Sequence, residues 1–251
     1  MAVTVDNIKN KTALVTGGAK RIGRTIVLAL AKSGVDVVVH YNNSGRDADD
    51  TVSEAAALGV RAWKIRADLS NGDAVRALIP EALNTAGRLD FLVNNASIFP
   101  ESRLDDLDPD DLRATLDINA VTPLTLAGHF ARSTAEGCIV NLLDSRIERL
   151  DMNHVAYQLS KNMLHTLTGM MAVAYAPGIR VNGVAPGLIL PPTDIDVSYI
   201  KRRGVKTLLG RQGSPENIAD AVLFLVSNDF VTGQVVIVDG GENIKRSSYG
   251  D

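Results

Sequence analysis

Short apolar runs alternate with longer amphipathic segments along the whole chain. The apolar runs are rich in Val, Ile and Thr and predict strands, because β-branched side chains suit an extended backbone. They fall at 12–16, 35–41, 61–67, 89–94, 138–143, 179–184 and 234–238. Apolar positions recur with a helical period at 22–33, 47–58, 73–86, 110–133, 154–175 and 215–227. Strict alternation of strand and helix predicts an α/β fold, a doubly wound parallel seven-stranded sheet with helices on both faces.

The chain reads as a single domain over residues 1–251, since no repeat, linker or low-complexity tract interrupts the alternation. One stretch breaks the rhythm, because residues 187–213 contain two adjacent prolines and a basic cluster with little helical period. Loops this long usually cover or form a site. We therefore expect a substrate loop at about 187–213, with an ordinary surface excursion as the alternative.

Composition excludes several classes of protein. A hydrophobic content of 45% with 22% charged residues predicts a folded core and argues against disorder. The net charge is −3 and the cations are scattered, so nucleic acid is not expected as a partner. We see no apolar targeting segment and no run near the roughly 20 apolar residues that span a bilayer. The expectation is a cytoplasmic protein without a membrane partner, whose single cysteine, Cys138, is a core residue.

A glycine-rich turn links the first strand to the first helix. Its residues run from Thr16 through Gly17 and Gly18 to Gly23. Glycine lets the backbone approach a pyrophosphate, and a helix N-terminus offers unpaired N–H donors. This strand–turn–helix context predicts a Rossmann-type dinucleotide site, although a tight turn without a ligand is the alternative.

The end of the second strand favours NADP(H) over NAD. An NAD site usually has a carboxylate there for the ribose 2′-hydroxyl, whereas this strand ends in His40, Tyr41, Asn42, Asn43 and Ser44. Lys20, Arg21, Ser44 and Arg46 could supply donors and positive charge to a 2′-phosphate. After the third strand, Asp68 could accept from the adenine amino group. Its alternative is a helix cap, a role in which Ser70 is the better candidate.

Tyr157 and Lys161 are the candidate catalytic pair. Their i, i+4 spacing on a predicted helix places the phenol and the ammonium on one face. A tyrosine with an ordinary pKa near 10 is a better acid at neutral pH when a cation stabilises the phenolate. Such a pair alone is more often exposed than catalytic, so the surrounding pattern decides.

That pattern resembles the short-chain dehydrogenase/reductase family over nearly the whole chain. The motifs are the glycine turn, Asn94-Asn95-Ala96, Asn119, Tyr157 with Lys161, and Val184-Ala185-Pro186-Gly187. The resemblance implies that Tyr157 donates a proton, Lys161 lowers its pKa and holds the nicotinamide ribose, and Asn119 continues a proton relay through water. It also implies a homotetramer in which the helix of Tyr157 forms a subunit contact. The cofactor residues implied are Gly17, Lys20, Arg21, Ile22, Gly23, His40, Tyr41, Asn42, Ser44, Asp68, Leu69, Asn95, Ala96, Ser97, Tyr157, Lys161, Pro186 and Gly187.

Two departures from the common family pattern point to one branch of it. Arg21 stands where the family usually has glycine, and Asp144 where it usually has the serine that polarises a carbonyl. Ser145 is adjacent, and a one-residue shift would restore a serine. We favour Asp144 because residues 139–141 align without a gap.

Both departures, with Phe99, resemble the pteridine reductases, which include bacterial dihydromonapterin reductases. The resemblance implies that Phe99 stacks on a pterin and that Arg21, Ser97, Asp144 and Tyr157 contact the substrate. A flat heterocycle binds well between an aromatic face and a nicotinamide, and reduction of a C=N bond needs a proton at nitrogen. Asn43 departs from the arginine that some pteridine reductases have there.

Two other functions remain open at this stage. A reductase of a 3-oxoacyl, steroid or sugar carbonyl would use Tyr157 and Lys161 with Ser145. A non-catalytic NADP-sensing module would not need the proton relay of Tyr157, Lys161 and Asn119. We expect no metal, because His129, His154 and His165 lack a ligand spacing. Met163, Met170 and Met171 read as helix-packing residues.

Overall fold

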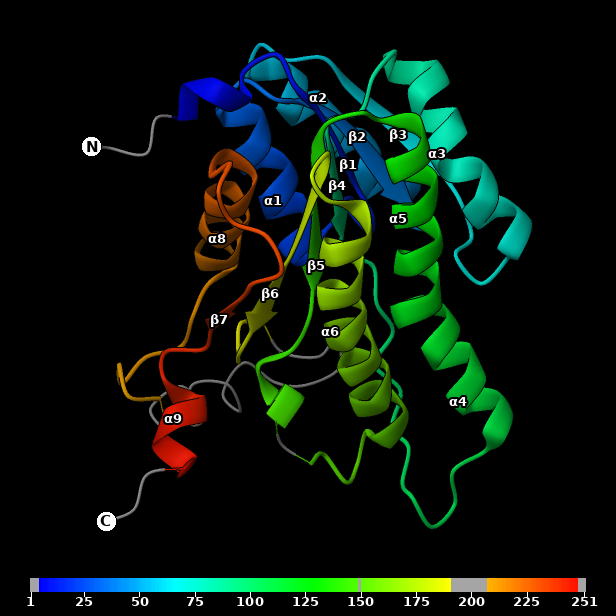
Figure 1. The fold of residues 1–251 in the computed structure, drawn as a ribbon, viewed down its shortest axis with the longest axis vertical. Coiled ribbons are helices and arrows are strands. Elements are labelled where there is room, and N and C mark those ends of the chain that lie inside the picture. Colours follow the sequence, from blue (N-terminus) through cyan, green and yellow to red (C-terminus); the bar gives the residue numbers. More distant parts are fainter. Residues whose placement is uncertain (1–4, 149, 191–206, 248–251) are drawn as a thin grey trace.

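The computed structural model describes residues 5–148, 150–190 and 207–247 and contains one seven-stranded parallel sheet (Figure 1). The strands are β1 (Thr12–Val15), β2 (Asp36–Tyr41), β3 (Ala62–Arg66), β4 (Phe91–Asn94), β5 (Gly137–Leu142), β6 (Ile179–Pro186) and β7 (Val235–Val238). Their order across the sheet is β3-β2-β1-β4-β5-β6-β7. The predicted fold is confirmed, and the chain reverses its winding direction between β1 and β4, where such sheets bind ligands.

Helices cover both faces of the sheet, as the alternation predicts. They are α1 (Arg21–Lys32), α2 (Gly45–Ala57), α3 (Gly72–Ala86), α4 (Pro109–Leu116), α5 (Thr122–Ser133), α6 (Val155–Tyr175), α8 (Pro215–Ser227) and α9 (Glu242–Ser247). Apolar side chains of α1, α2 and α8 share one core with the sheet, and those of α3, α5 and α6 share the other. Figure 1 shows α1 and α8 on the opposite side of the sheet from α5 and α6.

The helix predicted over 110–133 is interrupted in the structure. Between α4 and α5 lies the π-helical turn η2 (Asp117–Val121), which contains the fully buried Asn119. A π-turn adds one residue to a helical turn and often marks a functional site. Apolar periodicity continues across it, so the pattern of residues did not signal the break.

Three further features were not predicted or fall outside the description. The short turn η3 (Ser145–Glu148) follows β5, and α9 follows β7. Residues 191–206 of the expected substrate loop lie outside the described residues. No helix in the described part of the chain is long and apolar enough to cross a bilayer, and the cellular location stays a prediction.

Candidate active site

The glycine turn between β1 and α1 is packed too tightly for side chains. Gly17 has a φ of +61°, and a Cβ on Gly23 would lie 2.1 Å from the Gly17 carbonyl oxygen. The N-cap residue Lys20 makes no side-chain capping hydrogen bond, so N–H groups of the first turn of α1 have no cap from it. Ile22 packs its side chain on the adjacent core. This turn retains the geometry that a pyrophosphate requires.

Arg21 adopts a strained backbone at the position where a glycine is usual. Its φ is +56°, in the left-handed region that a side chain disfavours. Such strain persists where the surroundings impose it, and it is concentrated at ligand sites.

His40 supports the turn from beneath. Its Nδ1 accepts from Gly17 N at 3.0 Å, and its Nε2 lies 3.1 Å from Ala67 O, an arrangement that assigns the ring proton to Nε2. The side chain is 2% exposed, and burial lowers its pKa, so the ring is neutral. Protein atoms occupy both ring nitrogens, so a contact of His40 with the cofactor would not be made through them, and its place among the cofactor residues stays a prediction.

The residues expected to hold the adenosine half of the cofactor lie at the ends of β2 and β3, which we call the rim. Asn42 and Ser44 are half-buried there, and the hydroxyl of Ser44 does not cap α2. Arg66, which the sequence analysis missed, pairs in register with Tyr41, and its Nε donates to Asn42 O at 3.1 Å. Tyr41 itself packs against the core with Lys64 5.7 Å from its ring centroid.

Asp68 lies on this rim, next to β3. Hydrogen bonds from the backbone and hydroxyl of Ser70 lower the pKa of Asp68, so it is a charged acceptor. The cap of α3 is Asn71, which accepts from Asp73 N and Ala74 N, so Ser70 was the wrong choice. The side chain of Leu69 is buried in the core and does not face the rim.

The segment after β4 is locked to the turn. Thr16 Oγ1 accepts from Asn95 N and Ala96 N at 2.9 and 3.0 Å, and Asn95 Nδ2 donates to Thr16 O and Gly17 O. The side chain of Asn95 is thus used to join β1 and β4. Ser97, the next residue but one, is exposed and lies beside the site.

Asn119 fixes the same segment from the π-turn. Its Oδ1 accepts from Ile98 N, and its Nδ2 donates to Ile98 O and to Ser160 Oγ at 2.9 and 3.0 Å. Ser160 in turn donates to Tyr157 O. Asn119 therefore couples the loop before Phe99 to the first turns of α6, in addition to any relay through water.

Tyr157, Lys161 and Asp144 come together at the end of β5. Tyr157 OH donates to Asp144 Oδ2 at 3.1 Å, across thirteen residues of sequence. Lys161 Nζ lies 5.6 Å from the Tyr157 ring centroid and donates to Leu142 O at 2.8 Å. The structure thus places the Asp144 carboxyl, rather than the buried Ser145, against the phenol.

Burial shifts the pKa values of both Tyr157 and Lys161. Burial raises the pKa of Tyr157 well above 10, Asp144 raises it further, and Arg146 opposes the shift. The role of Lys161 in lowering this pKa stays a prediction, because the cation that opposes the shift here is Arg146. Burial also lowers the pKa of Lys161 to about 8.

Arg146 and His154 complete the wall of the site, and sequence reasoning assigned neither a role. His154 stacks on Phe99 with ring centroids 3.9 Å apart, and Tyr157 meets Phe99 edge-on at 4.5 Å. The Arg146 guanidinium lies 5.6 Å from the Phe99 centroid and 5.9 Å from that of Tyr157. The spacing of His154, three residues before Tyr157, could have signalled its place, whereas no pattern in the sequence marks Arg146.

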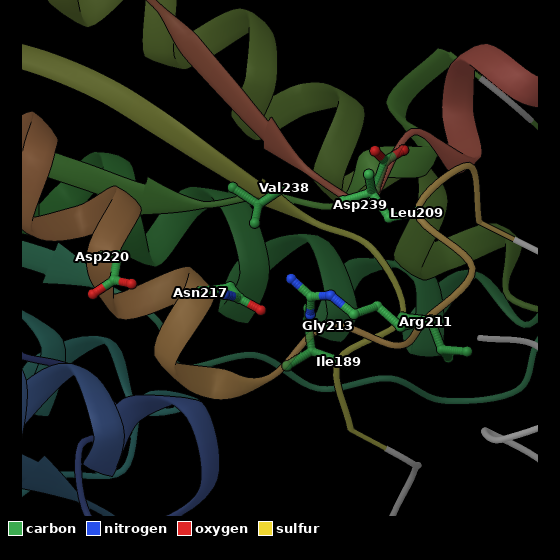
Figure 2. A pocket seen from close by; sticks show the side chains of 10 residues that line it. Ile189, Leu209, Arg211, Gly213, Asn217, Asp220, Val238 and Asp239 are labelled. Carbon is green, nitrogen blue, oxygen red and sulfur yellow. The ribbon is translucent and has the colours of Figure 1, made fainter. Parts of the chain in front are cut away.

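The end of β6 borders a separate cavity of about 280 Å³. Pro186 ends β6, and Gly187 packs so closely on Asp239 that a Cβ would lie 2.6 Å from its Cβ. Figure 2 shows the Arg211 guanidinium extending toward Asn217 in this cavity. Its lining includes none of the predicted catalytic residues. Among the described residues, no group of His, Cys, Asp and Glu could hold a metal.

Known proteins resemble this chain over nearly its whole length. A family model described as enoyl-(acyl carrier protein) reductase matches residues 17–243. The 3-oxoacyl-acyl-carrier-protein reductase of Staphylococcus epidermidis is 35% identical over 246 residues, covering 92% of this chain and 98% of its own. Glucose 1-dehydrogenase 2 of Bacillus subtilis is 31% identical over 252 residues, covering 96% and 98%. The solved structure of FolM alternative dihydrofolate reductase 1 from Brucella canis with NADP is 34% identical with a TM-score of 0.88, covering 94% and 96%.

Proposed function

Because this chain belongs to the short-chain dehydrogenase/reductase family, we propose that it is an NADPH-dependent reductase that reduces the C=N bond of a dihydropterin. Members of this family are oxidoreductases. Relatives named for different substrates match this chain over nearly their whole length. When bound, NADPH supplies the hydride. Tyr157 supplies the proton to the substrate nitrogen, and it holds that proton at neutral pH because even a phenol with an ordinary pKa near 10 is protonated there.

The residues of the turn and rim fit a phosphorylated dinucleotide. Gly17 and Gly23 leave room for a pyrophosphate beside the N-terminus of α1. Lys20, Arg21, Ser44, Arg46 and Arg66 supply donors for a 2′-phosphate. The FolM structure named above contains NADP, which supports the same preference here.

The observation that carries the pterin proposal is the carboxylate beside the phenol. Asp144 accepts from Tyr157 on one oxygen and from Arg146 on both, so it serves as an acceptor in each of these bonds. A ketone offers only an acceptor oxygen, which a carboxylate repels, whereas a dihydropterin also carries ring and exocyclic N–H donors. His154 covers one face of Phe99, so the pterin stacks on the other face or replaces His154.

A carbonyl reductase is the second candidate, favoured by the likeness to the Staphylococcus 3-oxoacyl reductase. It would use Ser145, and Ser145→Ala would then abolish activity while Asp144→Ser would not. A pure NADP-sensing module would show no turnover at all.

The test is NADPH oxidation with dihydrobiopterin and dihydromonapterin beside a panel of ketones. We expect turnover of dihydropterins, loss of it in Asp144→Ser, and little change in Ser145→Ala. Turnover of ketones alone would refute the pterin substrate and leave the reductase chemistry of Tyr157 and Lys161 in place.

We also propose a homotetramer in which α6 forms a subunit contact. Leu159, Met163, Met170 and Val173 are exposed on α6, with exposed fractions of 36% to 83%. Met171, by contrast, is buried in the core. Exposed apolar side chains in a row on one helix are typical of a subunit interface.

A further inference from the structure

Arg146 contacts both the carboxylate beside Tyr157 and the aromatic rings of the site. It lies on η3, between Asp144 and Asp151 in sequence. Its Nε and Nη2 donate to the two oxygens of Asp144, each at 2.9 Å, and its backbone N donates to Oδ1 at 2.8 Å. Nη1 donates to Asp151 at 2.5 Å. The side chain is 35% exposed, which is low for an arginine in a turn.

The fork geometry fixes the orientation of the Asp144 carboxylate. A bidentate guanidinium holds a carboxylate in one plane and keeps it charged. Oδ2 then accepts from both Nη2 and the phenol of Tyr157. Without the guanidinium, the Asp144 carboxylate could rotate away from the phenol, and its negative charge would lose its paired cation.

Arg146 is also connected to the stacked rings of Phe99 and His154, which we call the aromatic wall. Asp151, bonded to Arg146, accepts from Nδ1 of His154, whose ring stacks on Phe99. One cation thus links the carboxylate to the surface on which a flat substrate would stack.

The charged and titratable groups that face the Tyr157 phenol are few among the described residues. Asp144 and Asp151 disfavour the phenolate, Arg146 favours it, and Lys161 lies over the ring from the next turn of α6. His154 reaches Tyr157 only through Phe99. Arg146 is therefore the cation that offsets the two carboxylates.

We propose that Arg146 is a positioning residue: it fixes the Asp144 carboxylate against Tyr157 and supplies the positive charge that eases release of the phenolic proton. The proposal rests on the proposed function only in taking Tyr157 as the proton donor. It applies to whichever substrate the enzyme reduces.

The experiment compares Arg146→Met, Arg146→Lys and the wild type over a range of pH. Arg146→Met should lower kcat by about tenfold to a hundredfold, within the range of acid–base effects, while NADPH binding by fluorescence stays within about twofold. The basic limb of the kcat profile should move to higher pH, because Tyr157 and Lys161 would then face Asp144 without a competing cation. Arg146→Lys keeps the charge but not the fork, so it should restore the pH limb and only part of kcat.

Arg113 offers a matched control, since it pairs with Asp110 on the surface of α4 and is 72% exposed. Arg113→Met should leave kcat and its pH profile unchanged. Added guanidinium ion should raise kcat of Arg146→Met and not of Arg113→Met.

An unchanged kcat profile in Arg146→Met would overturn the proposal, and so would equal effects of the Met and Lys variants on the pH limb. The wild-type substrate panel tests the pterin assignment separately. Turnover of ketones alone would refute that assignment, and the ratio of variant to wild type on the ketone would still test Arg146.

Discussion

Lys161 and Tyr157 are both buried, and burial moves the pKa of each against its charged form. Burial favours the protonated, neutral form of Tyr157. For Lys161 it lowers the pKa to about 8, only slightly above neutral pH. Lys161 is therefore the more sensitive of the two to alkaline pH, because its pKa of about 8 lies below that of Tyr157.

Activity should decline as the pH rises through about 8, where Lys161 loses its proton. The ammonium is charged below that pKa, so kcat/KM, which reports the free enzyme, should fall on the alkaline side. A kcat/KM profile measures this directly. In Lys161→Arg the charge persists, so a limb near pH 8 in that variant would assign the titration to another group.

Backbone strain at Arg21 lowers the stability of the fold at a position where the side chain is expected to bind a phosphate. Because its φ is +56°, Arg21→Gly should relieve strain and raise the free energy of unfolding by about 1 kcal/mol. The same change should weaken NADPH binding, since a phosphate donor is removed. Urea unfolding and calorimetric NADPH titration measure the two effects, and a destabilised variant would show that contacts of the side chain outweigh the strain.

At the scale of elements, strands and helices were largely predictable, because burial on two faces imposes continuous apolar runs on strands and a helical period on helices. The i, i+4 spacing likewise predicted that Tyr157 and Lys161 share a face. The bonds of Arg146 were not predictable, since they depend on the conformation of η3, which has no periodic pattern. The π-turn was hidden because its neighbours keep a helical period.

The π-turn positions Asn119, and Asn119→Ala tests how much its hydrogen bonds contribute to stability and to kcat. The change leaves Ile98 N, Ile98 O and Ser160 Oγ without their partner, so unfolding should cost about 1 to 3 kcal/mol less. We also expect kcat to fall, because the loop before Phe99 and the first turns of α6 lose their link.

The matched control is Asn71→Ala, which removes the side-chain cap of α3, the helix that follows the edge strand β3. It should cost about 1 kcal/mol and leave kcat unchanged. Denaturant unfolding with steady-state kinetics separates the two variants. An equal loss of kcat in both would show that Asn119 acts only through stability.

At the scale of the whole molecule, the exposed face of α6 is the feature that assembly would cover. Val173 is 83% exposed, and Val173→Glu would place a charge in an apolar contact. We expect the tetramer to dissociate into smaller species by analytical ultracentrifugation. Leu104→Glu, at an exposed apolar residue outside the helices, should not change the mass. A monomeric wild type would contradict the assembly.

Five residues of backbone, 95–99, run between the two halves of the site. Asn95 ties one end to the glycine turn, Asn119 holds Ile98, and Phe99 begins the aromatic wall. In the proposed mode of binding, the nucleotide lies at one end of this segment and the substrate at the other. If bound nucleotide changes the affinity for substrate by some factor, bound substrate must change the affinity for nucleotide by the same factor.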